Sequence, residues 1–109
     1  MKIRFDRKEI FNKFNGRCAY CGVELDFNKF EVDHFKCKIG GGTDDIENLV
    51  PACRDCNNYK YHYSIELWRS YIENIYDELV KSSKWRVAEK MGIFERKSNK
   101  VKFYFEKHE

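Results

Sequence analysis

The sequence contains two Cys-x-x-Cys pairs whose spacing is that of metal ligands: Cys18 and Cys21, then Cys53 and Cys56. Two thiolates separated by two residues can approach one tetrahedral Zn²⁺ from a single tight turn, and two such turns supply four sulfur ligands. A site with four protein ligands has no position left for substrate, so we expect this zinc to be structural. The fifth cysteine, Cys37, is interpreted as a small apolar residue in a turn, with a reactive thiol or a fifth ligand as alternatives.

Polar residues that suit hydrolytic chemistry lie inside this frame or directly after it: Asp33, His34, Asn48 and Asn57. An imidazole, a carboxylate and two carboxamides suit a second, harder metal ion that prefers oxygen ligands. His34 is the natural general base, because a neutral imidazole can take a proton from water near neutral pH. Asn57 follows Cys56 directly, so the zinc would fix the start of its helix and thereby its side chain.

Basic residues border these positions, and four are candidate contacts to nucleic-acid phosphates: Lys60, Arg54, Lys36 and Lys38. The first two lie on the same predicted helix as Asn57, and the other two lie in the loop after His34. Proteins bind nucleic acids largely through such phosphate contacts. An ordinary solvated face is the competing interpretation of the same residues.

Short predicted elements must hold these residues in place. Residues 30–35 are compatible with a strand, on which Asp33 and His34 would point to opposite faces. A glycine-rich loop follows, then residues 48–52 as a second strand, and a helical pattern that begins at Arg54. Ahead of the first cysteine pair, residues 6–9 read as a capping box that begins a short helix.

The second half of the chain is predicted to extend this core. An amphipathic pattern over residues 64–79 predicts a helix, residues 83–97 are a weaker helical candidate, and residues 101–105 alternate as a late strand. The predicted fold class is α+β. We expect a single domain over residues 1–109, with a small core at residues 18–60 and a helical extension at residues 61–109.

Charge is unevenly distributed along the chain, although the formal net charge is only +3. Residues 81–109 carry nine Lys and Arg against four Asp and Glu, whereas residues 1–80 carry twelve against fourteen. A basic C-terminal section is consistent with a phosphate-bearing partner, and equally with a solvated face. No apolar run approaches the roughly 20 residues of a membrane span, so we expect a cytoplasmic protein without a membrane partner.

Four motifs follow one another along residues 18–60: Cys18-x-x-Cys21, Val32-Asp33-His34, the Gly-Gly-Thr-Asp-Asp-Ile-Glu-Asn-Leu-Val run at residues 41–50, and Cys53-x-x-Cys56-Asn57-x-x-Lys60. In this order they resemble the HNH endonucleases, in the zinc-stapled branch of the ββα-metal or His-Me finger nucleases. The resemblance implies a two-stranded antiparallel hairpin followed by a helix, stapled by a zinc with four cysteine ligands.

The resemblance also implies roles for the polar residues. Asp33 and Asn57 would hold a catalytic divalent ion, while His34 addresses the attacking water. Asn48 would hold the hairpin by hydrogen bonds and orient the His34 ring. Asn57 stands where many relatives carry a second histidine, which favours Mg²⁺ or Mn²⁺ as the catalytic ion. Cys37 stands where many relatives carry proline, a difference expected to affect only the stiffness of the loop.

The favoured hypothesis is a metal-dependent endonuclease that hydrolyses DNA phosphodiester bonds and leaves 5′-phosphate and 3′-hydroxyl ends, as the resemblance implies. RNA stays open as a target. The alternative is a non-catalytic, zinc-stapled nucleic-acid-binding module whose affinity resides in the basic C-terminal section, and a zinc-dependent protein–protein adaptor is a third interpretation. One active site cuts one strand, so a double-strand break would need a homodimer or two separate events.

Overall fold

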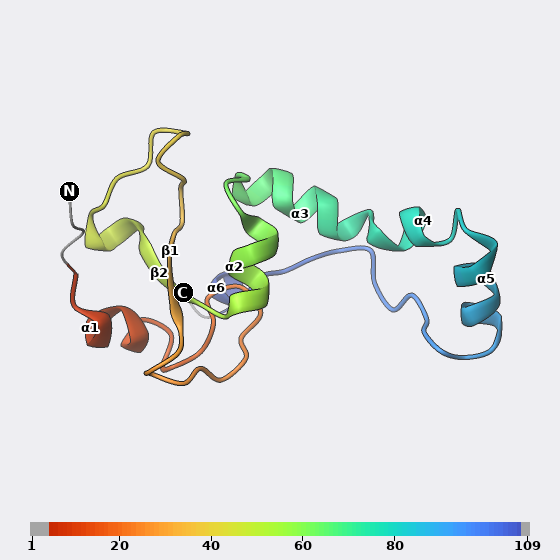
Figure 1. Ribbon diagram of the computed structural model, residues 1–109, viewed down its shortest axis with the longest axis horizontal. Coiled ribbons are helices and arrows are strands. Elements are labelled where there is room, and N and C mark those ends of the chain that lie inside the picture. The colour runs from red at the N-terminus through yellow and green to blue at the C-terminus, as the bar shows by residue number, and fades with distance from the viewer. Residues whose placement is uncertain (1–4, 108–109) are drawn as a thin grey trace. The chain divides into compact units, whose positions relative to one another are not determined.

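The computed structural model describes residues 5–107, which fall into two compact units (Figure 1). The first unit contains the described residues up to Ile65 together with those from Lys102 onward. The second unit is Glu66–Val101. All of the residues that the sequence assigns to the candidate site belong to the first unit.

A two-stranded antiparallel hairpin and one helix form the centre of the first unit (Figure 1). Strand β1 (Glu31–His34) pairs with β2 (Leu49–Ala52), with Asp33 opposite Val50 and His34 opposite Leu49. Helix α2 (Arg54–Lys60) begins two residues after β2. The predicted α+β class and the predicted hairpin followed by a helix are therefore confirmed. Because side chains alternate along a strand, Glu31 and Asp33 share one face of β1 and His34 lies on the other.

The hydrophobic core of this unit lies between the hairpin and helix α1 (Arg7–Asn12), where Ile10, Phe30 and Leu49 form a buried cluster. Asp6 begins α1 as the capping box predicts, since its side chain accepts hydrogen bonds from the backbone N–H groups of Lys8 and Glu9. The short helix η1 (Ile46–Asn48) leads directly into β2.

The turn that carries the first cysteine pair depends on Gly22, whose φ is +80°. This region of backbone conformation is open to glycine and strained for other residues. An added Cβ would also lie 2.5 Å from the Tyr104 ring, so the turn and the C-terminal segment can approach one another only with glycine at this position.

The second unit is helical, but its helices are shorter than the sequence predicts. The pattern over residues 64–79 forms two helices, α3 (Ile65–Glu73) and α4 (Ile75–Leu79), which meet at Asn74. Asn74 is a weak helix former, and its side chain donates a hydrogen bond to Glu78 at 3.1 Å. Helix α5 (Ser83–Lys90) stops well before residue 97, because Gly92 takes a φ of +81° and ends it.

The prediction of a late strand at residues 101–105 is wrong. Residues 101–103 have no regular structure, and Tyr104–Lys107 form helix α6. The backbone N–H groups of this segment have other partners than a neighbouring strand. Val101 donates to the Glu73 side chain at 2.8 Å, and Phe105 donates to the carbonyl oxygen of Ala19 at 2.8 Å. Alternation alone could not reveal partners this distant in sequence.

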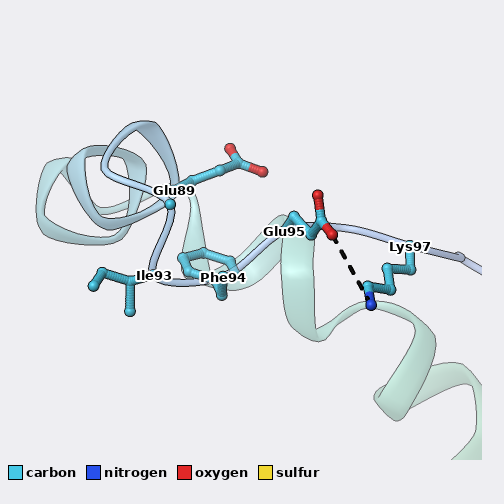
Figure 2. A pocket seen from close by; sticks show the side chains of 6 residues that line it. Glu89, Ile93, Phe94, Glu95 and Lys97 are labelled. Atoms are coloured by element: carbon cyan, nitrogen blue, oxygen red, sulfur yellow. Dashed lines mark ion pairs between the residues drawn. The ribbon is translucent and has the colours of Figure 1, made fainter.

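Two further features of the described residues bear on function. A surface pocket of about 480 Å³ lies in the second unit beside Phe94, and Figure 2 shows Glu95 and Lys97 at its edge, with an ion pair between them of 4.0 Å. Among residues 5–107, no helix combines the length and the apolar run that crossing a bilayer requires.

Candidate active site

The four paired cysteines converge as their spacing predicts. Their sulfur atoms all lie within 4.8 Å of one another. Cys53 is the N-cap of α2 and accepts a hydrogen bond from the Cys56 N–H at 3.4 Å, so the second pair is built into the start of that helix. Four sulfur ligands in this arrangement suit a metal ion such as Zn²⁺. Cys37 lies outside the cluster, and its sulfur accepts a hydrogen bond from the Gly40 N–H at 3.3 Å.

The thiols of this cluster differ in acidity because they share hydrogen bonds. A hydrogen bond from the Cys56 thiol lowers the pKa of Cys18 to about 5, so Cys18 carries the negative charge. The same hydrogen bond raises the pKa of Cys56, and burial raises the pKa of Cys21 to about 11. The metal-free cluster therefore holds protons that a bound metal ion must displace.

One side of β1, called here the helix side, faces α2 and carries buried charge. Asp33 is 8% exposed, and its Oδ2 atom lies 3.0 Å from the Lys60 ammonium. The Tyr20 hydroxyl donates to the same oxygen at 2.5 Å. Burial, followed by the Asp33 charge, raises the pKa of Tyr20, so its hydroxyl stays protonated as a donor.

The structure corrects the prediction that Lys60 contacts phosphate. Its side chain is fully buried, pairs with Asp33 and donates to the backbone carbonyl of His34 at 3.0 Å. A buried ammonium with two acceptors holds the strand to the helix and is not displayed to a ligand at the surface. Its position on α2 gave no sign of this, because burial depends on which face of the helix meets the hairpin.

Asn57 also lies on the helix side. Its side-chain nitrogen donates to Glu31 at 2.6 Å, which fixes the orientation of the carboxamide. Glu31 shares a face of β1 with Asp33, so three groups with oxygen atoms come from two adjacent elements. Carboxylate and carboxamide oxygens are ligands that Mg²⁺ and Mn²⁺ accept, and such ions commonly keep several waters. The residues present therefore fit a divalent ion of this kind.

The other side of β1, called here the loop side, carries His34. Its Nε2 atom lies 2.8 Å from the Asp44 carboxylate, and Lys38 lies 3.0 Å from the other oxygen of the same group. The hydrogen bond with His34, and then that with Lys38, holds the pKa of Asp44 below its ordinary value. Asp44 is thus ionised at neutral pH and favours the tautomer in which Nε2 carries the proton.

Asn48 braces the loop that supplies Asp44. Its side chain donates to the carbonyl oxygens of Lys36 at 2.9 Å and Thr43 at 2.8 Å, and it accepts from the Lys36 N–H at 2.9 Å. These bonds close the loop between the two strands. Asp44, which contacts the His34 ring, follows Thr43 directly in this loop.

The remaining candidate phosphate contacts lie at the surface. Arg54, Lys36 and Lys38 are exposed, and Lys38 is already paired with Asp44. A surface pocket of about 490 Å³ is lined by residues that include Glu31, Cys53 and Arg54. Two basic residues, Lys29 and Arg54, therefore line this pocket together with Glu31 and Cys53.

Three residues of this arrangement were not assigned to the site from the sequence: Tyr20, Glu31 and Asp44. Glu31 had a signal, since its spacing from Asp33 places both on one face of a strand. Asp44 lies within the motif at residues 41–50, but only the closed loop brings it to His34. The contact of Tyr20 with Asp33 spans thirteen residues, and nothing in the local pattern indicates it.

Comparisons with known proteins agree with this arrangement. Residues 18–62 match the family model described as HNH endonuclease. The protein named "SPbeta prophage-derived putative HNH endonuclease YoqL" of Bacillus subtilis is 34% identical over 88 residues, covering 66% of this chain and 36% of YoqL. The CRISPR-associated endonuclease Cas9 of Corynebacterium diphtheriae is 36% identical over 63 residues, covering 57% of this chain and 6% of that protein.

A solved structure is similar over the same region. The crystal structure of the Type II-C Cas9 enzyme from Actinomyces naeslundii matches with a TM-score of 0.53 and 26% identity, covering 58% of this chain and 7% of that one. The chain thus spans about a third of YoqL and a small part of each Cas9. The similarity to Cas9 is to one region of a much longer protein.

Proposed function

We propose that this chain is a metal-dependent endonuclease that hydrolyses DNA phosphodiester bonds, because residues 18–62 match the HNH endonuclease family model. The observation that carries the proposal is the arrangement along β1. A histidine braced by a carboxylate lies on one side of the strand, and two carboxylates with an oriented carboxamide lie on the other. The proposed base and the two carboxylates thereby come from one short strand, and the carboxamide comes from α2.

His34 is proposed as the general base. Its Nε2 proton is directed to Asp44, so Nδ1 is the nitrogen that can take a proton from the attacking water. The negative charge of Asp44 would stabilise the imidazolium that results. Lys38 neutralises the outer oxygen of Asp44 and limits its movement toward solvent.

Asp33 and Asn57 are proposed to hold the divalent ion, with Glu31 beside them. When bound, such an ion stabilises negative charge on the phosphoryl oxygens and on the leaving oxygen. Lys60 pairs with the buried Asp33 side chain, and Glu31 holds the Asn57 carboxamide with its nitrogen turned to the carboxylate. The oxygen of Asn57 is then the atom presented to the ion.

DNA is the proposed substrate, and its backbone would lie across the exposed basic residues of the first unit. Arg54 and Lys36 are the exposed candidates whose side chains have no ion pair among the described residues. Binding through them should weaken as salt rises, because each phosphate contact releases counterions. One site cuts one strand, so a nicked duplex is the expected product.

The test compares two histidines of the same domain. His34→Ala should abolish nicking of supercoiled plasmid in Mg²⁺ or Mn²⁺, because the general base is lost; a general base contributes about 10²–10⁴-fold. His62→Ala is the matched control, since His62 is exposed and its ring contacts the rings of Tyr61 and Tyr63. Zinc content and the melting temperature should be the same for both variants.

Undiminished nicking by His34→Ala would refute the proposed mechanism. Salt-sensitive DNA binding by the wild type without any product, at every Mg²⁺ and Mn²⁺ concentration, would instead identify a binding module without catalysis. Cutting of RNA in place of DNA would change the proposed substrate but not the proposed role of His34 as general base.

A further inference from the structure

Tyr20 lies in the middle of the first cysteine pair, yet its side chain is directed into the protein and is 2% exposed. Its backbone N–H donates to the Cys18 sulfur at 3.4 Å, and its carbonyl oxygen accepts from the Tyr104 N–H at 2.9 Å. The backbone of Tyr20 is thus fixed on one side by a zinc ligand and on the other by the start of α6.

Aromatic packing fixes the direction of the Tyr20 ring. Phe103 and Phe105 pack edge-on against it, with centroid distances of 6.0 and 6.4 Å. The Lys60 ammonium lies 5.7 Å from the ring centre. These contacts direct the hydroxyl to Oδ2 of Asp33.

Asp33 receives both of its side-chain donors on one oxygen. The Tyr20 hydroxyl and the Lys60 ammonium both bind Oδ2, at 2.5 and 3.0 Å. Two donors on a single oxygen prevent the carboxylate from rotating, so Oδ1 keeps one direction. A tenth of the Asp33 side chain remains exposed.

We propose that Tyr20 is a positioning residue for the divalent ion: its hydroxyl holds Oδ2 of Asp33 so that Oδ1 is presented as the ligand. Tyr20 thereby connects the four-cysteine cluster to the proposed site of hydrolysis, because its backbone contacts Cys18 and its hydroxyl contacts Asp33. This inference rests on the proposed role of Asp33 as a ligand of the ion.

The variant Tyr20→Phe removes the hydroxyl and keeps the ring against Phe103 and Phe105. The chain offers a matched control in its second unit, where the Tyr76 hydroxyl donates to Glu89 at 2.6 Å. Tyr76→Phe also deletes a hydrogen bond from tyrosine to carboxylate, but it does so among residues that make none of the contacts of the site.

Mn²⁺ binding is measured directly by electron paramagnetic resonance, with each tyrosine variant combined with His34→Ala so that no turnover occurs. Tyr20→Phe should weaken Mn²⁺ binding about tenfold, the lower end of what removing a partner of a metal ligand costs. Tyr76→Phe should leave binding unchanged. With His34 intact, Tyr20→Phe should need about tenfold more Mn²⁺ for half-maximal nicking, and its rate at saturating Mn²⁺ should return near that of wild type.

The other possible results distinguish failure of the inference on Tyr20 from failure of the proposed nuclease function. Equal Mn²⁺ affinity in Tyr20→Phe and its parent would overturn the inference while leaving an active nuclease intact. Loss of zinc from Tyr20→Phe would also overturn it, because the hydroxyl would then serve the cysteine cluster. Weakened Mn²⁺ binding in a chain that never cuts DNA would retain the inference and refute the proposed function, whereas a parent that binds no Mn²⁺ would refute both.

Discussion

The two sides of strand β1 are stabilised in different ways. On the helix side, Asp33 is buried, and its partners Tyr20 and Lys60 are buried too. On the loop side, His34 keeps 23% of its side chain exposed, and Asp44 keeps 38%. The helix side is tied to the cysteine cluster at two points, through Tyr20 and through Cys53 at the start of α2. The loop side contains no cysteine of that cluster and is held by Asn48.

This difference suits two tasks. A divalent ion needs ligands whose positions do not change, and buried charges with complete sets of partners have little freedom to move. A general base must meet a water whose position depends on the bound nucleic acid, and an exposed pair on a braced loop can adjust to it. We therefore expect that removing a side-chain partner on the helix side lowers the free energy of unfolding. Removing a partner on the loop side should instead lower the rate of cleavage.

The largest effect is expected from loss of the zinc. Cys56→Ser should prevent stable zinc binding and unfold the first unit, because metal binding to small domains contributes about 10–16 kcal/mol. Zinc content and thermal unfolding measure this. Cys37→Ser is the control, since Cys37 lies outside the cluster. A folded Cys56→Ser protein without zinc would show that the helix side does not need the metal.

The pKa values of the cysteine thiols predict how zinc affinity depends on pH. The raised pKa values of Cys21 and Cys56 mean that both thiols are protonated near neutral pH in the metal-free protein, whereas Cys18, with a pKa of about 5, is not. Zinc must then displace at least these two protons, so its affinity should fall by at least about 100-fold for each pH unit of acidification. Competition with a chromophoric chelator at two pH values measures this slope, and a flat result would contradict the assignment.

The second prediction compares one lysine from each side. Lys60→Met should lower the free energy of unfolding by about 3–5 kcal/mol, because it leaves the Asp33 charge buried without its ion-pair partner. Lys38→Met should leave stability within experimental error, since its pair with Asp44 is exposed. Urea unfolding of the two variants gives both values.

Equal free energies of unfolding for the two lysine variants would contradict the proposed difference between the helix side and the loop side of β1. A loss in Lys60→Met that disappears in the double variant Lys60→Met with Asp33→Asn would support it. In that variant the uncompensated charge is absent, so the main cost of the single substitution is removed.

The sequence predicts the elements near the site better than the contacts that complete it. The cysteine spacing, the alternation around Asp33 and the helix after Cys53 are local patterns, and the structure contains each of them. The burial of Lys60 is not local, because it depends on how α2 meets β1. Composition does not reveal it either, since a lysine on a short helix is usually exposed.

The residues after α2 show the same limit in another form. The amphipathic pattern over residues 64–79 correctly indicates helix, but it does not show that Asn74 divides the helix in two. Residues 101–105 alternate like a strand, yet the chain here bonds with a helix side chain and with the turn around Ala19. Local patterns determine which conformation is favourable, and distant partners determine whether the chain adopts it.

For Asp44→Asn we expect a small change in stability and a clear effect on rate. An asparagine can present either its oxygen or its nitrogen to His34 Nε2, so the ring would no longer be restricted to one tautomer. Nicking at saturating Mn²⁺ should fall about tenfold, a part of what a general base contributes. Single-turnover rates and ¹⁵N spectra of the His34 ring measure both consequences. Asp45→Asn is the matched control, because Asp45 pairs with Thr43 and not with the histidine.

The pH at which this test is made follows from the acidity of Asp44. Its lowered pKa means that its contribution to stability is complete above the ordinary value of 3.8 and is lost only as the pH falls through the lower, folded-state value. Near neutral pH the carboxylate is therefore charged in the wild type. An unchanged rate in Asp44→Asn, with the tautomer preserved, would show that the loop side positions His34 through the backbone of β1 alone. The two sides of β1 would then both be rigid. They would differ in how deeply their residues are buried, but not in how they serve the reaction.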